Sequence, residues 1–174
     1  MNLKRENNNQ FYFTTNGDKI TKINKDKFLK KYNLHLVIKF HPEEYSKMPN
    51  NYLVHFNLQH TGHIKGRLYA LVKINQAGFF TPEKEVPPIL DLNNFFIVKC
   101  IEAKNNLSYE DLTSKDFEHS FGHIKNIKQL KKIILKRYSK SLPHLSKEEI
   151  LSYGIAITKL KIVSPEKFKE KLKK

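Results

Sequence analysis

Two carboxylates and a lysine flank the most apolar segment of this chain, Phe95-Phe96-Ile97-Val98-Lys99-Cys100-Ile101. Asp91 precedes the segment, and Glu102 and Lys104 follow it. Carboxylate oxygens of this kind hold Mg²⁺, and a bound Mg²⁺ can activate a water molecule for hydrolysis. The chemistry requires the two carboxylates at adjacent strand ends, and the spacing permits that arrangement. Acidic residues and lysines are also the ordinary composition of a solvated strand end, so a structural role stays open.

The histidines and the cysteine predict less chemistry. His60-x-x-His63 and His119-x-x-x-His123 have spacings compatible with a metal ion, but neither pair has a cysteine or the glutamate of a helical zinc motif. We therefore expect no metal site. Cys100 lies in the most apolar segment and is predicted to be a core residue. The sequence contains no phosphate-binding G-x-x-x-x-G-K loop, and we expect no cofactor.

A basic segment with helical spacing predicts binding to phosphates. Between Ser120 and Ser146 the chain has seven basic residues and no acidic one. Solvated helix faces usually mix charge signs for i,i+4 pairing, so this imbalance favours a polyanionic partner over a merely solvated face. An apolar stripe at helical spacing predicts a helix over 124–138. We expect the phosphate contacts to come from Lys125, Lys128, Lys132 and Lys136.

Two loops combine amides, aromatic rings and basic side chains. The loop 60–67 is glycine-containing and carries Lys65 and Arg67, which we expect to enter a groove or hold the nucleic-acid backbone. The loop 75–81 carries amides beside aromatic rings, and bases lifted from their stack are recognised by such groups. Packing against the core is the alternative role of the rings. The predicted base pocket consists of Tyr52, Asn75, Gln76, Phe79, Phe80, Phe117 and Phe121.

Several elements must position these residues. We predict a hairpin over 11–23 with an Asn16-Gly17 turn, a short helix capped by Asn24, and strands over 34–40, 52–58 and 64–74. Further predictions are a strand over 94–103, a short helix after Ser108, the basic helix, a helix capped by Ser146, a strand over 155–163 and a terminal basic helix from 165. Residues 1–10 are expected to be disordered.

The composition limits the class of protein. The net charge is +15 on 174 residues, and self-repulsion of that size favours a polyanionic partner such as nucleic acid. The hydrophobic fraction of 39% supports a folded core. We expect one domain over 11–174, in which 11–50 is a candidate N-terminal extension. A single cysteine and no apolar leader or membrane-spanning run predict a cytoplasmic protein with no membrane partner.

Parts of this sequence resemble known protein families. The set Asp91, Glu102 and Lys104 resembles the PD-(D/E)xK nucleases, which implies a Mg²⁺-dependent nuclease. From Tyr52 to about Lys140, the order of features is similar to the PUA-like superfamily, which includes the EVE, YTH and ASCH domains. The strand with its small residues over 63–74, the Pro-containing loop 81–88, the apolar strand, the capped turn at 107–112 and the basic helix follow in that order.

The PUA-like resemblance implies an α+β fold, a small curved β-barrel with short peripheral helices whose pocket takes a flipped, often modified, base. The loops 60–67 and 75–81 would line the pocket, with 117–123 as a third wall. YTH-type readers hold the base with tryptophans, and this chain has none. The composition also resembles the B3-like DNA-binding barrels, which are the alternative fold.

These observations lead to one expectation and two alternatives. We expect a non-catalytic nucleic-acid-binding module, with DNA favoured over RNA, that reads a sequence or a modified base in a restriction-type system. A catalytic domain or subunit of a larger enzyme is a further expected partner. The alternatives are the Mg²⁺-dependent nuclease and an RNA-binding or ASCH-like RNA-processing protein.

Overall fold

The structure is a computed structural model that describes residues 11–40, 52–80, 83–118, 120 and 124–163. The chain divides into two compact units, each built from segments that are distant in the sequence. Unit 1 contains the described residues 11–40, 68–80, 83–98 and 163, and unit 2 contains 52–67, 99–118, 120 and 124–162. Residues 11–40, the described part of the candidate extension, share a sheet with later strands of unit 1.

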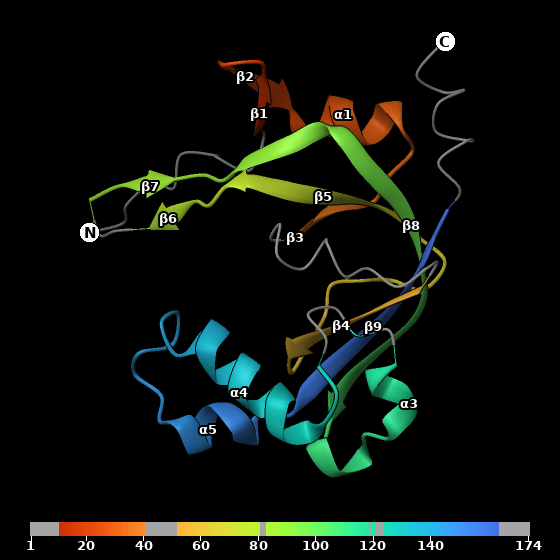
Figure 1. The fold of residues 1–174 in the computed structure, drawn as a ribbon, viewed down its shortest axis with the longest axis vertical. Coiled ribbons are helices and arrows are strands. Elements are labelled where there is room, and N and C mark those ends of the chain that lie inside the picture. The colour runs from red at the N-terminus through yellow and green to blue at the C-terminus, as the bar shows by residue number, and fades with distance from the viewer. Residues whose placement is uncertain (1–10, 41–51, 81–82, 119, 121–123, 164–174) are drawn as a thin grey trace. The chain divides into compact units, whose positions relative to one another are not determined.

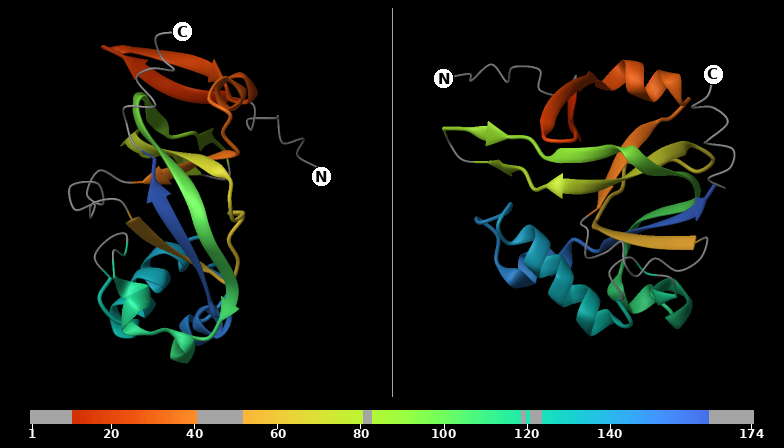
Figure 2. Two further views of the ribbon diagram at one scale, coloured as in Figure 1. Left: turned by 90° about the vertical axis from the view of Figure 1, so that its right-hand side faces the viewer. Right: turned by 45° about the horizontal axis from the view of Figure 1, so that its top comes forward.

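Unit 1 begins with the predicted hairpin, in which β1 (Phe11–Asn16) pairs antiparallel with β2 (Lys19–Asn24). The two-residue loop of this hairpin is Gly17-Asp18, which lies one residue later than the predicted Asn16-Gly17. Of the two loop residues, only Gly17 has a positive φ, 63°. Glycine at the first loop position is typical of a type II′ turn, whereas Asn16-Gly17 predicted type I′. The hairpin leads directly into α1 (Lys25–Lys31), which Asn24 caps as predicted (Figure 2).

The strands of unit 1 follow the order β2-β1-β8-β5-β3. β3 (Leu36–Phe40) is parallel to β5 (Leu68–Gln76), and the first part of β8 (Ile89–Leu107) is parallel to β1. Among the described residues this path does not close on itself, so the fold is mixed α+β and the predicted barrel is not confirmed. Its core contains a cluster of edge-to-face aromatic rings, namely Tyr12, Phe28, Tyr32 and Phe95.

A second, two-stranded sheet belongs to unit 1. β6 (Phe79–Phe80) pairs antiparallel with β7 (Glu85–Val86). The sequence predicted a loop over 75–81. The structure corrects this prediction, because Phe79 and Phe80 form a short strand within it. Two-residue strands are too short for an alternating pattern of hydrophobicity to identify them.

Unit 2 is built on β4 (Tyr52–Leu58) and β9 (Ile155–Ile162), which run antiparallel side by side (Figure 1). β9 also pairs with β8. The predicted strand over 64–74 begins only at Leu68. The reason is a turn at 65–66, in which Gly66 has a φ of 86° and donates its amide hydrogen to the Cys100 carbonyl at 2.8 Å. The predicted strand over 94–103 is longer than expected and spans Ile89–Leu107.

Short helices complete unit 2. They are η2 (Tyr109–Asp111), α3 (Ser114–Phe117), α4 (Ile127–Tyr138) and α5 (Lys147–Ser152). The predicted caps at Ser108 and Ser146 are confirmed, and a further capping box at Thr113, which the sequence analysis missed, begins α3. Cys100 is fully buried, as predicted. The core of this unit lies under α4 and α5 and includes Val54, Phe56, Leu130, Ile134 and Ile157.

Two predicted elements, the disordered N-terminus and the terminal basic helix, lie outside the described residues. Within the described residues, no helix combines the length and the apolar character needed to cross a bilayer.

Candidate nucleic-acid interface

The helix α4 and the residues just before and after it present a row of lysines to solvent. Asn126 caps the helix by accepting a hydrogen bond from the Gln129 amide at 2.9 Å, so the helix begins three residues later than predicted. Leu130 and Ile134 are fully buried and hold the opposite side against the core. The remaining exposed lysines, which we call the lysine row, are spaced by three or four residues: Lys125, Lys128, Lys132, Lys136 and Lys140.

The other two basic residues of the segment have local roles. The Lys131 ammonium lies 5.0 Å from the centroid of the Tyr109 ring, a cation–π contact. Arg137 donates a hydrogen bond from Nη1 to the Phe56 carbonyl oxygen at 3.3 Å. Both side chains are half-buried and attach α4 to the rest of unit 2. The lysine row is therefore a distinct subset of the basic segment.

Like charges recur every three or four residues along the lysine row. Within the described part of the chain, none of its five ammonium groups forms an ion pair, and the first turn of α4 has no acidic residue. Lysines at i,i+4 on a helix destabilise it by about 0.2–0.5 kcal/mol per pair. An external polyanion would remove this repulsion.

A shallow, open cavity of about 520 Å³ lies at the beginning of α4. It brings together three residues that the sequence analysis singled out separately, namely Phe117 as a base-pocket residue and Lys125 and Lys128 as phosphate contacts. Its remaining lining residues were not predicted and are Leu112, Thr113, Ser114, Asn126 and Ile127. The capping signals at Thr113 and Asn126 are the sequence features that could have indicated these two helix starts.

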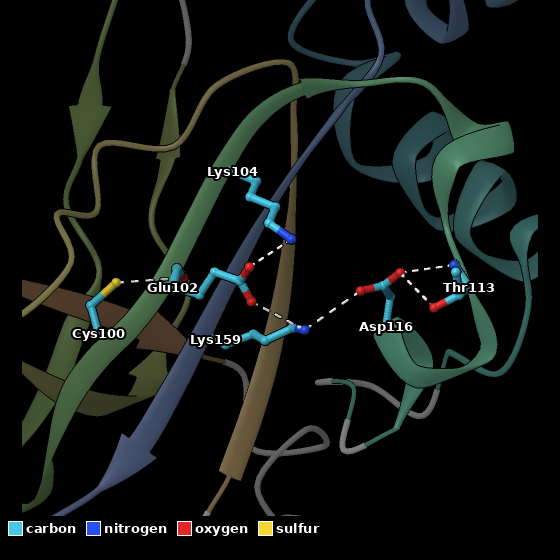
Figure 3. Close-up of polar contacts among 6 residues, drawn as sticks. All are labelled: Cys100, Glu102, Lys104, Thr113, Asp116 and Lys159. Atoms are coloured by element: carbon cyan, nitrogen blue, oxygen red, sulfur yellow. Dashed lines mark hydrogen bonds and ion pairs between the residues drawn. The ribbon is translucent and has the colours of Figure 1, made fainter.

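The helix α3, which forms one wall of this cavity, is held by an ion-pair network (Figure 3). The Asp116 carboxylate accepts hydrogen bonds from the backbone amide and the hydroxyl of Thr113, at 2.8 and 3.2 Å. The Lys159 ammonium lies 3.6 Å from Asp116 and 3.2 Å from Glu102, so it joins α3 to β8 and β9. Lys104 pairs with Glu102 at 2.6 Å.

This network changes the interpretation of the acidic constellation. Hydrogen bonds and charges from Lys104 and Lys159 lower the pKa of Glu102, with the Lys104 hydrogen bond as the largest cause, so the carboxylate is ionised and paired within the fold. Asp91 lies on the same strand, β8, and not on an adjacent strand end as the nuclease chemistry requires. Its carboxylate accepts hydrogen bonds from the backbone amides of Asn93 and Asn94. Among the described residues, no three His, Cys, Asp or Glu side chains gather as metal ligands.

The other predicted base-pocket residues are distributed over both units. Tyr52 belongs to unit 2 and is 43% exposed. The Lys161 ammonium lies 5.9 Å from the centroid of the Tyr52 ring. Asn75 and Gln76 are exposed at the end of β5 in unit 1, where the Asn75 amide donates to the Thr15 hydroxyl at 3.4 Å. Phe79 and Phe80 form β6 in unit 1. Phe121 lies outside the described residues.

The loop 60–67 lies in unit 2 and exposes both of its predicted basic residues, Lys65 and Arg67. Its backbone is attached to β8, because the Arg67 carbonyl accepts a hydrogen bond from the Cys100 amide at 2.9 Å. The loop is therefore a fixed turn that presents two cations to solvent.

Two residues of this loop, Thr61 and His63, belong to a polar cluster that the sequence analysis missed. The His63 Nδ1 atom is 2.7 Å from the Thr61 hydroxyl and 2.9 Å from the Thr158 hydroxyl, which is fully buried. The rings of His63 and His55 meet edge to face. Burial, with smaller contributions from Arg137 and His63, lowers the pKa of His55 to about 3, so this ring is neutral near pH 7. The pair His119 and His123 lies outside the described residues.

Comparisons with known proteins give no relative for this chain. No protein-family model matches it, and neither the curated proteins nor the solved structures include a significant match.

Proposed function

We propose that this chain is a non-catalytic nucleic-acid-binding protein whose main contact surface is the lysine row along α4 and its two ends. The observation that carries the proposal is a line of five exposed lysines with no ion pair among the described residues. In a protein with a net charge of +15, such a surface attracts phosphates by releasing the counterions that surround them. DNA is the first target to test, with RNA as the comparison.

The loop 60–67 supports a second contact region within unit 2. Lys65 and Arg67 are exposed at a turn whose backbone is fixed by hydrogen bonds to Cys100. A fixed turn holds its cations in place at a smaller entropic cost than a mobile one. The PUA-like barrel and its capacity to read a modified base remain part of this proposal, and their support is the order of sequence features alone.

The test is fluorescence-anisotropy binding to labelled duplex DNA, single-stranded DNA and RNA across a salt series. Lys132→Gln with Lys136→Gln removes two phosphate contacts, so the slope of log K against log salt should fall by about 1.4–1.8. The matched control is Lys27→Gln with Lys30→Gln, which makes the same charge change on the exposed side of α1 in unit 1.

The control should leave most of the salt slope intact. Equal slopes for the two double variants would refute the assignment of the contact surface to α4. The probes are also incubated with Mg²⁺ and Mn²⁺, and intact probes support a non-catalytic role. Cleavage that depends on the metal and is lost in Asp91→Ala would establish the nuclease alternative instead.

A further inference from the structure

The cavity at the beginning of α4 has an apolar interior and a cationic rim. Leu112 is buried, and Phe117 and Ile127 are half-buried, so a partly water-exposed apolar surface lies between α3 and α4. Lys125 and Lys128 are exposed lining residues, and neither forms an ion pair within the described part of the chain. The volume of about 520 Å³ lies within the usual range for small-ligand sites. A complementary occupant has an apolar part and a negative charge attached to it.

The wall that carries the aromatic ring is preorganised. Phe117 packs against Phe56 with ring centroids 5.6 Å apart, which holds its ring in place. The Thr113–Asp116 capping box and the Lys159 ion pair fix the short helix on which Phe117 lies (Figure 3). A ring that is already held in place loses little conformational freedom on binding.

From the apolar interior with its fixed aromatic ring and from the two lysines at the rim, we infer that the cavity holds one unstacked base of a single-stranded nucleic acid. The phosphates on either side of this base contact Lys125 and Lys128. The inference rests on the proposed function and names the form of nucleic acid that this site takes. Stacking on an aromatic ring tolerates any base, because every base has a π face.

The lysine row offers a path along which the bound nucleic-acid strand can continue beyond the cavity. Lys128 lines the cavity and is also a member of the row, one helical turn before Lys132. Phosphates that follow the bound base would therefore meet Lys132 and Lys136 in turn. A duplex can place a base in the cavity only after unpairing and unstacking it, which costs a few kcal/mol in general. The site therefore selects single strands over duplexes.

The experiment compares two labelled 12-nucleotide single strands that have the same phosphates. One is oligothymidylate, and the other is abasic at every internal position. The wild-type protein should bind the base-containing strand about 5- to 150-fold more tightly, which is the usual range for stacking of a base on an aromatic side chain. Annealing the complement of the oligothymidylate should weaken its binding.

Two variants test the cavity itself. Phe117→Leu removes the aromatic face, and Ser114→Leu adds bulk at an exposed lining residue without removing any core side chain. Both should reduce the preference for the base-containing strand towards 1, while their salt slopes stay as in wild type. Circular dichroism and the urea midpoint check that each variant is folded, and Ser114→Leu keeps the test decisive if Phe117→Leu unfolds.

The outcomes separate this inference from the proposed function. If the wild-type protein bound the two strands equally well and its salt slope still depended on Lys132 and Lys136, the base site would be overturned. The lysine row would then remain the supported contact surface. No salt-dependent binding to any nucleic acid would overturn both. Binding of a poly-glutamate peptide that is as tight as that of oligothymidylate and is weakened by Ser114→Leu would assign the cavity to an acidic peptide and overturn the base site.

Discussion

The ion pairs of Glu102 lead to a prediction about stability that can be worked from the structure. Glu102→Gln preserves the size of the side chain and removes its charge. Lys104, at 2.6 Å, and Lys159, at 3.2 Å, then lose a carboxylate partner. Among the described residues, Lys159 keeps only Asp116, at 3.6 Å. The Lys104 side chain is 54% exposed, whereas Glu102 and Lys159 are each 32% exposed, so solvent screens the first pair more.

Exposed pairs contribute about 0.2–1 kcal/mol each, so we expect the loss of both to lower the free energy of unfolding by about 1 kcal/mol at pH 7. For a chain of this size, that change lowers Tm by about 2–4 °C. Because the fold lowers the pKa of Glu102, its contribution is complete above the unfolded-state pKa and is lost as the pH falls through the folded-state pKa. The difference between wild type and variant should therefore shrink between pH 7 and pH 3.5.

Urea unfolding followed by circular dichroism at the two pH values measures this difference. The matched control is Glu110→Gln, which makes the same chemical change at an exposed residue of η2 that has no ion pair among the described residues. An unchanged urea midpoint for Glu102→Gln at pH 7 would refute the structural role that we assign to Glu102. A difference that is just as large at pH 3.5 would show that the effect does not come from its charge.

Two further predictions concern unit 2. His55 has a pKa of about 3, below the ordinary value of about 6.5, so the unfolded chain takes up a proton first and stability falls as the pH drops through this window. The variant His55→Asn keeps an acceptor near the Asn57 amide. Measured by urea unfolding, this variant should lose less stability than wild type between pH 7 and pH 5. Equal losses in the two proteins would contradict a lowered pKa at His55. Gly154 has a φ of 75°, and a Cβ there would lie 2.7 Å from the Leu107 carbonyl oxygen, so Gly154→Ala should destabilise the fold by about 1–3 kcal/mol. Gly62→Ala, where a Cβ would meet nothing within 4 Å, is the control, and equal urea midpoints for the two variants would contradict the prediction.

Local sequence signals determined the elements whose stability is itself local. The hairpin at Gly17, the cap at Asn24 and the capping box at Ser146 are each formed by residues close together in the chain, and each is present in the structure. The amphipathic stripe likewise predicted α4, because its period of 3.6 residues places one set of side chains in the core and the lysine row outside.

Only the tertiary structure decided which of these residues meet. The turn at Gly66 depends on a hydrogen bond to Cys100, which is distant in the sequence, so the pattern over 64–74 could not reveal where β5 begins. The partner of Glu102 on β9, Lys159, follows from strand pairing, and this pairing made an apparent catalytic carboxylate part of an ion-pair network. The cavity that joins Phe117 to the lysine row is lined by residues of α3 and of the beginning of α4, two segments whose meeting no local signal indicates. The sequence alone thus determined the charge, the helix and its exposed lysines, whereas long-range packing determined the site, since contacts between distant segments leave no periodic signal in the chain.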